Sequence, residues 1–307
     1  MIKLSENVIE DFAIKLFECL GYFYEQPERE NYSDVLLIER LQSAINHINP
    51  TIPESARQQA LKEVERIHSP ELLVNNETFH RMLTEGVKVT YQKDGHERGD
   101  SVMLIDFDNP ENNEFLVVNQ FTVIENHQEK RPDVILFVNG LPLVVIELKN
   151  PTSEDATIQS AYRQLTTYKA TIPSLFNYNA LLVISDGLEA KAGSLSADFS
   201  RFMTWKTVDG KNEESHLVSQ LETLINGMLN KKTLLDLVRH FVVFEKSKKV
   251  DAITDVISIH TVKKIAAYHQ YCAVNKAINS TLLASNEYQA IKKLGLFGIH
   301  KVAAYYN

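Results

Sequence analysis

The stretch RPDVILFVNGLPLVVIELKN, residues 131–150, decides the fold of this chain. It holds two apolar runs of strand length, and Asn139-Gly140 between them is a pair typical of a tight turn joining antiparallel strands. Asp133 begins the first run, and Glu147 and Lys149 end the second. Side chains two residues apart in a strand share a face, so Glu147 and Lys149 are expected to point the same way. The stretch therefore predicts two buried, paired strands whose charged residues gather at one sheet edge.

These charged residues indicate a metal site. Two carboxylates, Asp133 and Glu147, converging near a sheet edge would form the hard-oxygen pocket that Mg²⁺ prefers, with water and a substrate phosphate completing the coordination. A metal there polarises the phosphorus–oxygen bond, lowers the pKa of a bound water and aligns its attack. Lys149 would hold the attacking water or neutralise charge that develops on the phosphate. The pattern predicts metal-dependent hydrolysis of phosphodiesters, with an exposed strand that merely ends in charged residues as the alternative.

The turn between the two strands tests this interpretation. A regular two-residue turn at Asn139-Gly140 would place Asp133 opposite Ile146 and leave Glu147 on the other face of the sheet. Such a turn would separate the two proposed ligands. We therefore expect a loop of odd length, or a bulge farther along either strand, that returns both carboxylates to one face.

Outward from this stretch, the chain changes between helical and strand patterns. Helices are predicted over residues 6–20, 34–48, 54–68, 76–85 and 155–170, the last opened by Thr152 or Ser153. Strands are predicted over residues 87–92, 101–107, 115–124, 133–138, 143–149 and 180–185. Residues 215–243 and 252–284 return to a helical pattern, in which we expect no strand. The order of helix, several strands, helix and strand predicts an α/β (α+β) fold.

Two further pairs of residues are candidates for the same site. Gln164 and Tyr168 lie four residues apart on a predicted helix, so they share one face and could lean toward the carboxylates, although such residues are also common half-buried filler. Glu6 and Glu10 on the first helix could add a carboxylate. Acidic residues at a helix N-terminus also complement the helix dipole, and we favour that interpretation for both.

Charge is distributed unevenly along the chain. The net charge of -8 argues against a protein that simply coats nucleic acid. Residues 231–307 nevertheless contain 12 Lys and Arg against 5 Asp and Glu, whereas residues 1–230 contain 20 against 35. The basic part is either a solvated helical surface or a surface that contacts phosphates.

Several protein classes are excluded by the sequence. The first residues carry Glu6, Glu10 and Asp11 where a signal peptide would need an apolar stretch, and no apolar run approaches the roughly 18 to 20 residues of a membrane span. Two cysteines make neither a disulfide framework nor a thiolate zinc cluster. We expect a globular cytoplasmic protein without a membrane partner.

The chain, including its candidate site, resembles the N-terminal region of the restriction (R, or HsdR) subunit of type I restriction-modification enzymes, within the PD-(D/E)XK nuclease superfamily. The resemblance covers roughly residues 1–284. It is carried by Leu104-Ile-Asp-Phe, Asn119-Gln-Phe, Arg131-Pro-Asp, Asn139-Gly-Leu-Pro, Val145-Ile-Glu-Leu-Lys-Asn, Gln164-x-x-x-Tyr168, Ser185-Asp-Gly, Arg201-Phe-x-x-Trp205 and Tyr268-His-Gln-Tyr-x-Ala-Val.

The resemblance implies a fold and a set of roles. The fold is a restriction-endonuclease-like core, a mixed β-sheet flanked by helices, in a nuclease domain over residues 1–230. Residues 231–307 would be a basic helical segment that in the family leads into a DNA translocase motor. By resemblance Asp133 and Glu147 are the metal ligands for Mg²⁺ and Lys149 is the catalytic lysine. Gln164 and Tyr168 form the Q-x-x-x-Y motif.

The resemblance also has limits. In the family Gln270 belongs to the nucleotide pocket of the motor, but no G-x-x-x-x-G-K-[ST] phosphate loop occurs in this sequence. ATP serves the full-length family and is not expected to bind this chain alone. From about Ser285 the sequence no longer follows the family pattern.

The expected partners are double-stranded DNA and the modification (M) and specificity (S) subunits, the latter choosing the DNA sequence. An autonomous repair or junction nuclease with the same chemistry is an alternative, which a requirement for partner subunits would distinguish. A truncated docking module that binds the methyltransferase core without cutting is another. The intact Asp133, Glu147 and Lys149 argue against it, because docking requires none of them.

Overall fold

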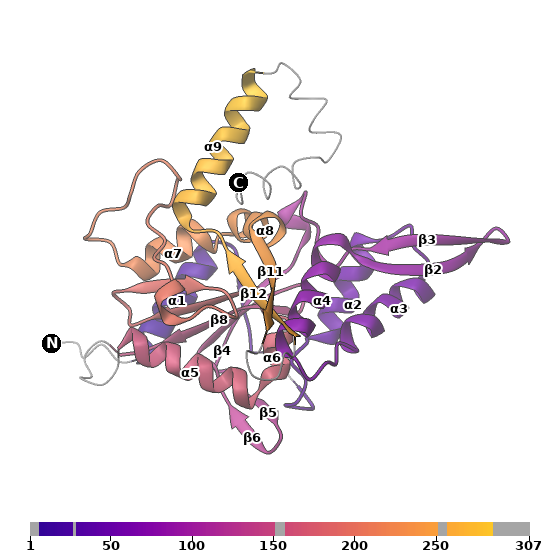
Figure 1. The fold of residues 1–307 in the computed structure, drawn as a ribbon, viewed down its shortest axis with the longest axis horizontal. Helices are drawn as coiled ribbons and strands as arrows, with labels where there is room; N and C mark the ends of the chain where they lie inside the picture. The colour runs from indigo at the N-terminus through magenta and orange to yellow at the C-terminus, as the bar shows by residue number, and fades with distance from the viewer. Residues whose placement is uncertain (1–5, 27–28, 151–156, 251–256, 285–307) are drawn as a thin grey trace.

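The centre of the protein is a mixed six-stranded sheet (Figure 1). A computed structural model describes residues 6–26, 29–150, 157–250 and 257–284. The strands of this sheet are β1 (Phe23–Tyr24), β4 (Phe115–Asn119), β7 (Val134–Val138), β8 (Leu141–Leu148), β9 (Leu181–Ser185) and β10 (Ala190–Gly193). Their order is β1-β4-β7-β8-β9-β10, with β8 antiparallel to β7 and parallel to β9. The α/β class and mixed sheet predicted from the sequence are confirmed.

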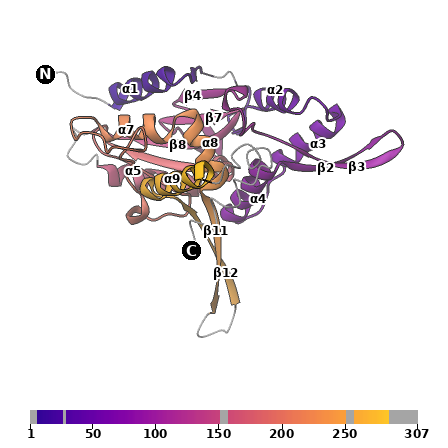
Figure 2. The same ribbon diagram turned by 90° about the horizontal axis from the view of Figure 1, so that it is seen from above.

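Helices cover both faces of the sheet. The helices are α1 (Glu6–Cys19), α2 (Ile38–Ile48), α3 (Glu54–Glu65), α4 (Leu72–Glu85), α5 (Ile158–Thr171), α6 (Pro173–Asn177), α7 (Gln220–Met228), α8 (Lys231–His240) and α9 (Tyr268–Ala284), with short 3₁₀ helices η1 (Pro110–Asn112) and η2 (Phe199–Arg201). Helix α1 packs on one face and α5 on the other (Figure 2). Every residue of β7 and β8 is buried as a result, which explains why these strands are apolar on both faces.

Three hairpins lie outside the main sheet. They are β2 (Val87–Lys93) with β3 (His96–Val102), β5 (Val123–Glu125) with β6 (Gln128–Lys130), and β11 (Val242–Val250) with β12 (Ile257–Ile265). Figures 1 and 2 show the β2–β3 hairpin extending from one side of the body and the β11–β12 hairpin projecting from one face.

The turn between β7 and β8 has two residues, and a bulge follows it. Asn139 and Gly140 have φ values of 53° and 78°, as a type I′ turn requires. Val138 pairs with Leu141, but the register shifts by one residue farther along, leaving Leu143 without a partner on β7. This compensating bulge confirms the expectation drawn from the turn. Continued by one residue, the register sets Asp133 directly opposite Glu147.

Several expectations about individual elements were wrong. The strand predicted over 101–107 lies earlier, at β3, and residues 115–124 contain two strands separated by a turn. Strand β12 lies inside the range 252–284 that was predicted to be helical, and β11 begins at the last two residues of the range 215–243. The two strands pair through nine residues each. Helix α5 is capped by the Thr157 side chain, while Thr152 and Ser153 lie outside the described residues.

The proposed basic helical segment is therefore only partly helical. Its buried residues Leu234, Leu237, Phe241 and Ile265 belong to the same hydrophobic core as the sheet. A division of the chain after residue 230 stays a prediction. In the part that the structure describes, none of the helices has the length and apolarity needed to cross a membrane.

Candidate active site

Three strand ends meet at one edge of the main sheet. Strands β4 and β7 run antiparallel, so Asn119 at the end of β4 lies beside Val134 at the start of β7. Strand β8 ends at the same place, because Ile146 also pairs with Val134. Side chains just beyond these pairs are therefore brought together from segments distant in sequence.

A pocket of about 670 Å³ opens at this edge. Its walls come from α1, α5 and the ends of β4 and β7. Figure 2 shows α1 and α5 on opposite sides of β8. Of the predicted site residues, Asp133, Lys149 and Gln164 line it. Glu6 and Glu10 of α1 line it as well, so the pocket is predominantly acidic.

Asp133 is 8% exposed and is held by two donors. The backbone N–H of Leu148 donates to Asp133 Oδ2 at 2.8 Å, and the Gln120 side-chain amide donates to Oδ1 at 3.3 Å. Burial raises the pKa of Asp133 to about 6, although the Leu148 N–H and the charge of Lys149 favour its ionised form. The carboxylate is thus fixed in orientation and sensitive to nearby charge.

Glu147 is fully buried beside it. Its Oε1 accepts a hydrogen bond from Lys149 Nζ at 2.7 Å, whereas its Oε2 has no hydrogen-bond partner in the described part of the chain. Burial and then the charge of Asp133 raise the pKa of Glu147 to about 9, against the opposing charge of Lys149. A buried acceptor left without a donor is destabilising unless something binds it.

Lys149 links the strand to the first helix. Its ammonium also donates to Glu6 Oε1 at 3.0 Å, and its backbone N–H donates to the Ser185 carbonyl at 2.8 Å. Burial lowers the pKa of Lys149, but the charge and hydrogen bond of Glu147 outweigh that effect, so its pKa is raised overall. The lysine therefore carries a positive charge between two carboxylates.

The structure also brings Glu6 and Glu10 into the pocket, which the helix-dipole interpretation did not anticipate. Glu10 accepts hydrogen bonds from the Asn119 side chain and, at 2.7 Å, from Gln120 Nε2. Gln120 therefore bridges Glu10 and Asp133, and it does so from a left-handed backbone conformation with φ 51°. Asn119-Gln-Phe carries part of the family resemblance, but no local pattern in the sequence assigns Gln120 a role.

Gln164 and Tyr168 lie together on α5, as their spacing predicts. Gln164 Nε2 donates to the Tyr168 hydroxyl at 2.6 Å, and that hydroxyl donates to the Arg131 carbonyl at 3.4 Å. Burial, followed by the charge of Glu147, raises the pKa of Tyr168, so the phenol stays protonated. The pair therefore ties α5 to the segment that leads into Asp133.

Residues 3–201 match the family model described as type I restriction enzyme R protein N terminus. The chain belongs to this family. It is 42% identical over 297 residues to the type I restriction enzyme HindI endonuclease subunit of Haemophilus influenzae, covering 92% of this chain and 27% of that protein. It is 37% identical over 297 residues to the putative MjaIXP endonuclease subunit of Methanocaldococcus jannaschii, covering 91% of this chain and 28% of that protein. The chain thus spans about a quarter of the length of these R proteins.

The last predicted site residue, Gln270, lies apart from the pocket that Asp133 lines. It is in the first turn of α9, where its side-chain Oε1 accepts the backbone N–H of Ala267 at 3.0 Å. Gln270 does not line the pocket that contains Asp133. The nucleotide contact implied by the resemblance stays a prediction.

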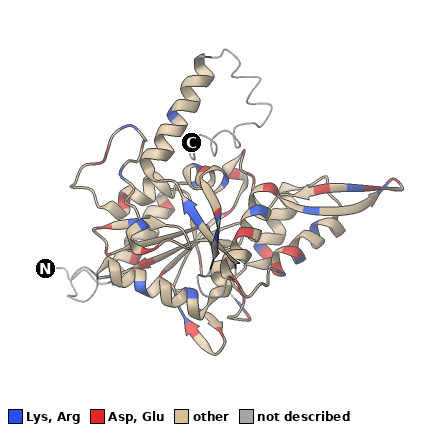
Figure 3. Ribbon diagram, in the orientation of Figure 1, with Lys and Arg blue, Asp and Glu red and all other residues tan. Residues whose placement is uncertain are grey.

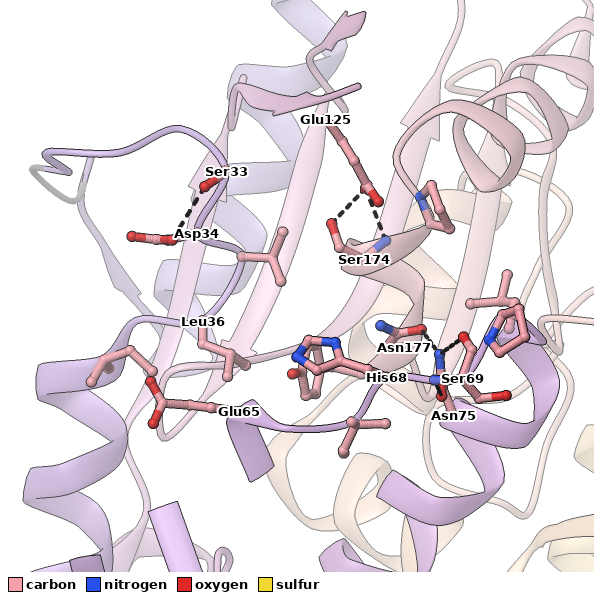
Figure 4. Close-up of a pocket in the computed structure, with 17 residues that line it drawn as sticks. Ser33, Asp34, Leu36, Glu65, His68, Ser69, Asn75, Glu125, Ser174 and Asn177 are labelled. Carbon is pink, nitrogen blue, oxygen red and sulfur yellow. Dashed lines mark hydrogen bonds between the residues drawn. The ribbon is translucent and has the colours of Figure 1, made fainter. Parts of the chain in front are cut away.

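A second hollow, of about 700 Å³, shares no lining residue with the first pocket. Figure 4 shows Glu125 pointing toward Ser174, whose backbone N–H and hydroxyl donate to it at 3.0 and 2.7 Å. Asn75 in turn donates to the Ser69 carbonyl at 2.9 Å and to the Asn177 side chain at 3.1 Å. These polar groups hold the surrounding loops together, and none of the predicted site residues lines this hollow.

Proposed function

We propose that this chain carries the nuclease site of a type I restriction R protein and hydrolyses phosphodiester bonds of double-stranded DNA with Mg²⁺. The convergence of Asp133, Glu147 and Lys149 at the open sheet edge carries the proposal. The endonuclease names of the relatives support the same reaction class.

The residues present suit a divalent cation. No group of three or more His, Cys, Asp or Glu suited to a metal occurs within the described ranges. Mg²⁺ does not require one, since it is commonly held by one or two carboxylates together with water and substrate phosphate. The unsatisfied Oε2 of Glu147, next to the fixed carboxylate of Asp133, supplies a buried oxygen that a cation would satisfy.

The protein groups would divide the work as follows. Asp133 and Glu147 would hold Mg²⁺, which when bound supplies charge neutralisation and acidifies water. Lys149 would stabilise negative charge as it develops on the phosphate, because its ammonium is kept charged by two carboxylates. Gln120 and the Leu148 N–H would hold Asp133 in place through their hydrogen bonds.

The electrostatics favour an enzyme over a docking module. Burying two neighbouring carboxylates raises the pKa of both, so the pair is unfavourable for folding. A docking surface would gain nothing from that arrangement, whereas a metal site needs it. We also propose that the M and S subunits are partners of this chain and that it acts on DNA in the cytoplasm.

The direct test is cleavage of supercoiled plasmid DNA. The chain is incubated with Mg²⁺, with and without a cognate modification core and ATP, beside an Asp133→Asn variant. We expect nicked or linear DNA from the unaltered chain and none from the variant. Equal cutting by the variant would contradict the site assignment. Assembly with the core but no cleavage under any condition would favour the docking module.

A further inference from the structure

A second groove adjoins the proposed active site on the side of α5. It encloses about 410 Å³ and shares Arg131 and Gln164 with the acidic pocket, so the two spaces meet at these residues. Lys130, Arg163 and Tyr168 also line it. The groove thus leads from the carboxylates across the face of α5 that carries Gln164.

The two spaces have opposite charge. Glu6, Glu10, Asp11 and Asp133 line the pocket. The groove has three cations, Lys130, Arg131 and Arg163, against the single acidic residue Glu129. Figure 3 shows basic residues along α5. A polyanion is repelled by the acidic pocket wall, and the groove supplies opposing charge at its border.

Two cations of the groove, Arg131 and Arg163, are free to bind an anion. Neither Arg131 nor Arg163 forms an ion pair with any described residue, and both are exposed. Several basic residues after residue 230 instead form ion pairs with acidic residues. Lys231 pairs with Glu111 at 2.8 Å, Arg239 with Asp108 at 2.7 Å and Lys246 with Glu77 at 2.9 Å.

Local structure directs Arg131 toward the site. It precedes Pro132, which restricts it to an extended backbone, and it lies two residues before Asp133. Residues two apart in an extended chain point to the same side, consistent with Arg131 lining the pocket that holds Asp133. The Tyr168 hydroxyl fixes this segment through the Arg131 carbonyl.

We propose that Arg131 and Arg163 bind phosphates of the DNA backbone next to the bond that is cut, on the α5 side of the active site. The inference rests on the proposed function and adds the path by which the strand enters. Both arginines would act as positioning residues that contact phosphate and read no base. Their contribution is therefore independent of DNA sequence and sensitive to salt.

The test measures binding of a fluorescent duplex to the full chain by anisotropy, with Ca²⁺ in place of Mg²⁺. Arg131→Gln, Arg163→Gln and their double variant are compared with Arg66→Gln, which removes an exposed arginine at the end of α3. We expect each groove variant to weaken binding equally for unrelated duplexes. Each should also lower the slope of log Kd against log salt by about 1, and Arg163→Lys should retain the slope.

Different results contradict the phosphate contacts of Arg131 and Arg163 and the nuclease function. Tight DNA binding by the double variant, with the slope of Arg66→Gln, would overturn the phosphate contacts and leave the nuclease proposal intact. Absence of DNA binding by the unaltered chain at low salt would also overturn the phosphate contacts, whereas the nuclease proposal fails only if plasmid DNA is not cleaved with the modification core present. In cleavage assays the groove variants should raise KM with little change in kcat, the reverse of Asp133→Asn.

Discussion

The carboxylate of Asp133 accepts a hydrogen bond from the backbone N–H of Leu148, across the strand pair and one residue beyond Glu147. This hydrogen bond holds the Asp133 carboxylate against β8, the strand that carries Glu147. The contact depends on the strand register and not on flexible side chains. Substitutions that keep the shape of this site should therefore separate its chemistry from its stability.

Asp133→Asn and Glu147→Gln should lower the rate of cleavage by roughly 10³-fold or more. Neither substitution should lower the free energy of unfolding. Each variant keeps the shape of the side chain and cannot ionise, and burial is the largest cause that raises the pKa of both carboxyl groups. Plasmid cleavage and urea denaturation without metal measure the two effects. Glu97→Gln, on the exposed strand β3, is the matched control. Marked destabilisation by Asp133→Asn would show a structural role instead.

Lys149→Met should eliminate cleavage and leave the affinity for divalent cations equal or higher. The ammonium occupies Glu147 Oε1 at 2.7 Å and opposes a second positive charge, so its removal frees an oxygen ligand. Calorimetric titration with Mn²⁺ measures the affinity. A clear loss of metal binding would mean that Lys149 positions the ligands and that its proposed role on the phosphate is wrong.

Gly140→Ala should lower the free energy of unfolding by roughly 2 to 4 kcal/mol. Its φ is 78°, and an added Cβ would collide with the Leu37 carbonyl oxygen. Gly95 has nearly the same φ, 77°, with open space around it, so Gly95→Ala should cost only about 1 kcal/mol. The difference, measured by urea denaturation, isolates the close approach at the β7–β8 turn. Equal effects would contradict it.

Lys263 should make stability rise with pH. Its side chain is 1% exposed, and Nζ donates to Asn76 Oδ1 and the Asn179 carbonyl at 2.9 and 2.7 Å. Burial lowers the pKa of Lys263 to about 7 in the folded chain, from 10.5. Between these values the unfolded chain binds more protons at this lysine, so Lys263 adds a contribution to the unfolding free energy that increases with pH, by up to about 1.4 kcal/mol per pH unit. Glu147, whose folded pKa is about 9, contributes a slope of the opposite sign below that pH, so the Lys263 contribution is the difference between the protein with and without this lysine.

Urea denaturation between pH 7 and 9.5 tests this slope. Lys263→Met should reduce it, whereas Lys264→Met, at the exposed neighbour, should not. Burial and the charge of Lys263 lower the pKa of His80 to about 3, so that histidine stays neutral over this range and does not contribute. Identical slopes for all three proteins would show that Lys263 titrates as it does in water.

Local patterns in the sequence predict the centre of the fold and the positions of Asp133, Glu147 and Lys149 at the ends of its strands. Apolar runs identify β7 and β8, and the Asn139-Gly140 pair identifies their turn. The bulge at Leu143 has no local signal, because a leucine there suits either face of a doubly buried strand. Only the requirement that Asp133 and Glu147 share a face implied it.

Other features depend on contacts distant in sequence. Residues 242–250 and 257–265 hold several lysines, which are poor strand formers, and pairing between the two strands decides their structure. Glu10 reaches the site because α1 packs across β4 and β8, and no spacing within α1 encodes that. Lys263 would be expected at the surface until β12 docks against α4.

The bulge at Leu143 leaves β8 with one spare residue between the turn and Glu147. A gene that lost one codon from positions 141–146 could straighten the strand and still set Glu147 opposite Asp133. The residues displaced in that change are mostly apolar and fully enclosed on both sides, so they could exchange sides. A gained codon would add another unpaired residue to β8, and the strand would need a second bulge to keep Glu147 opposite Asp133. Among related genes, single-codon losses here should therefore outnumber single-codon gains.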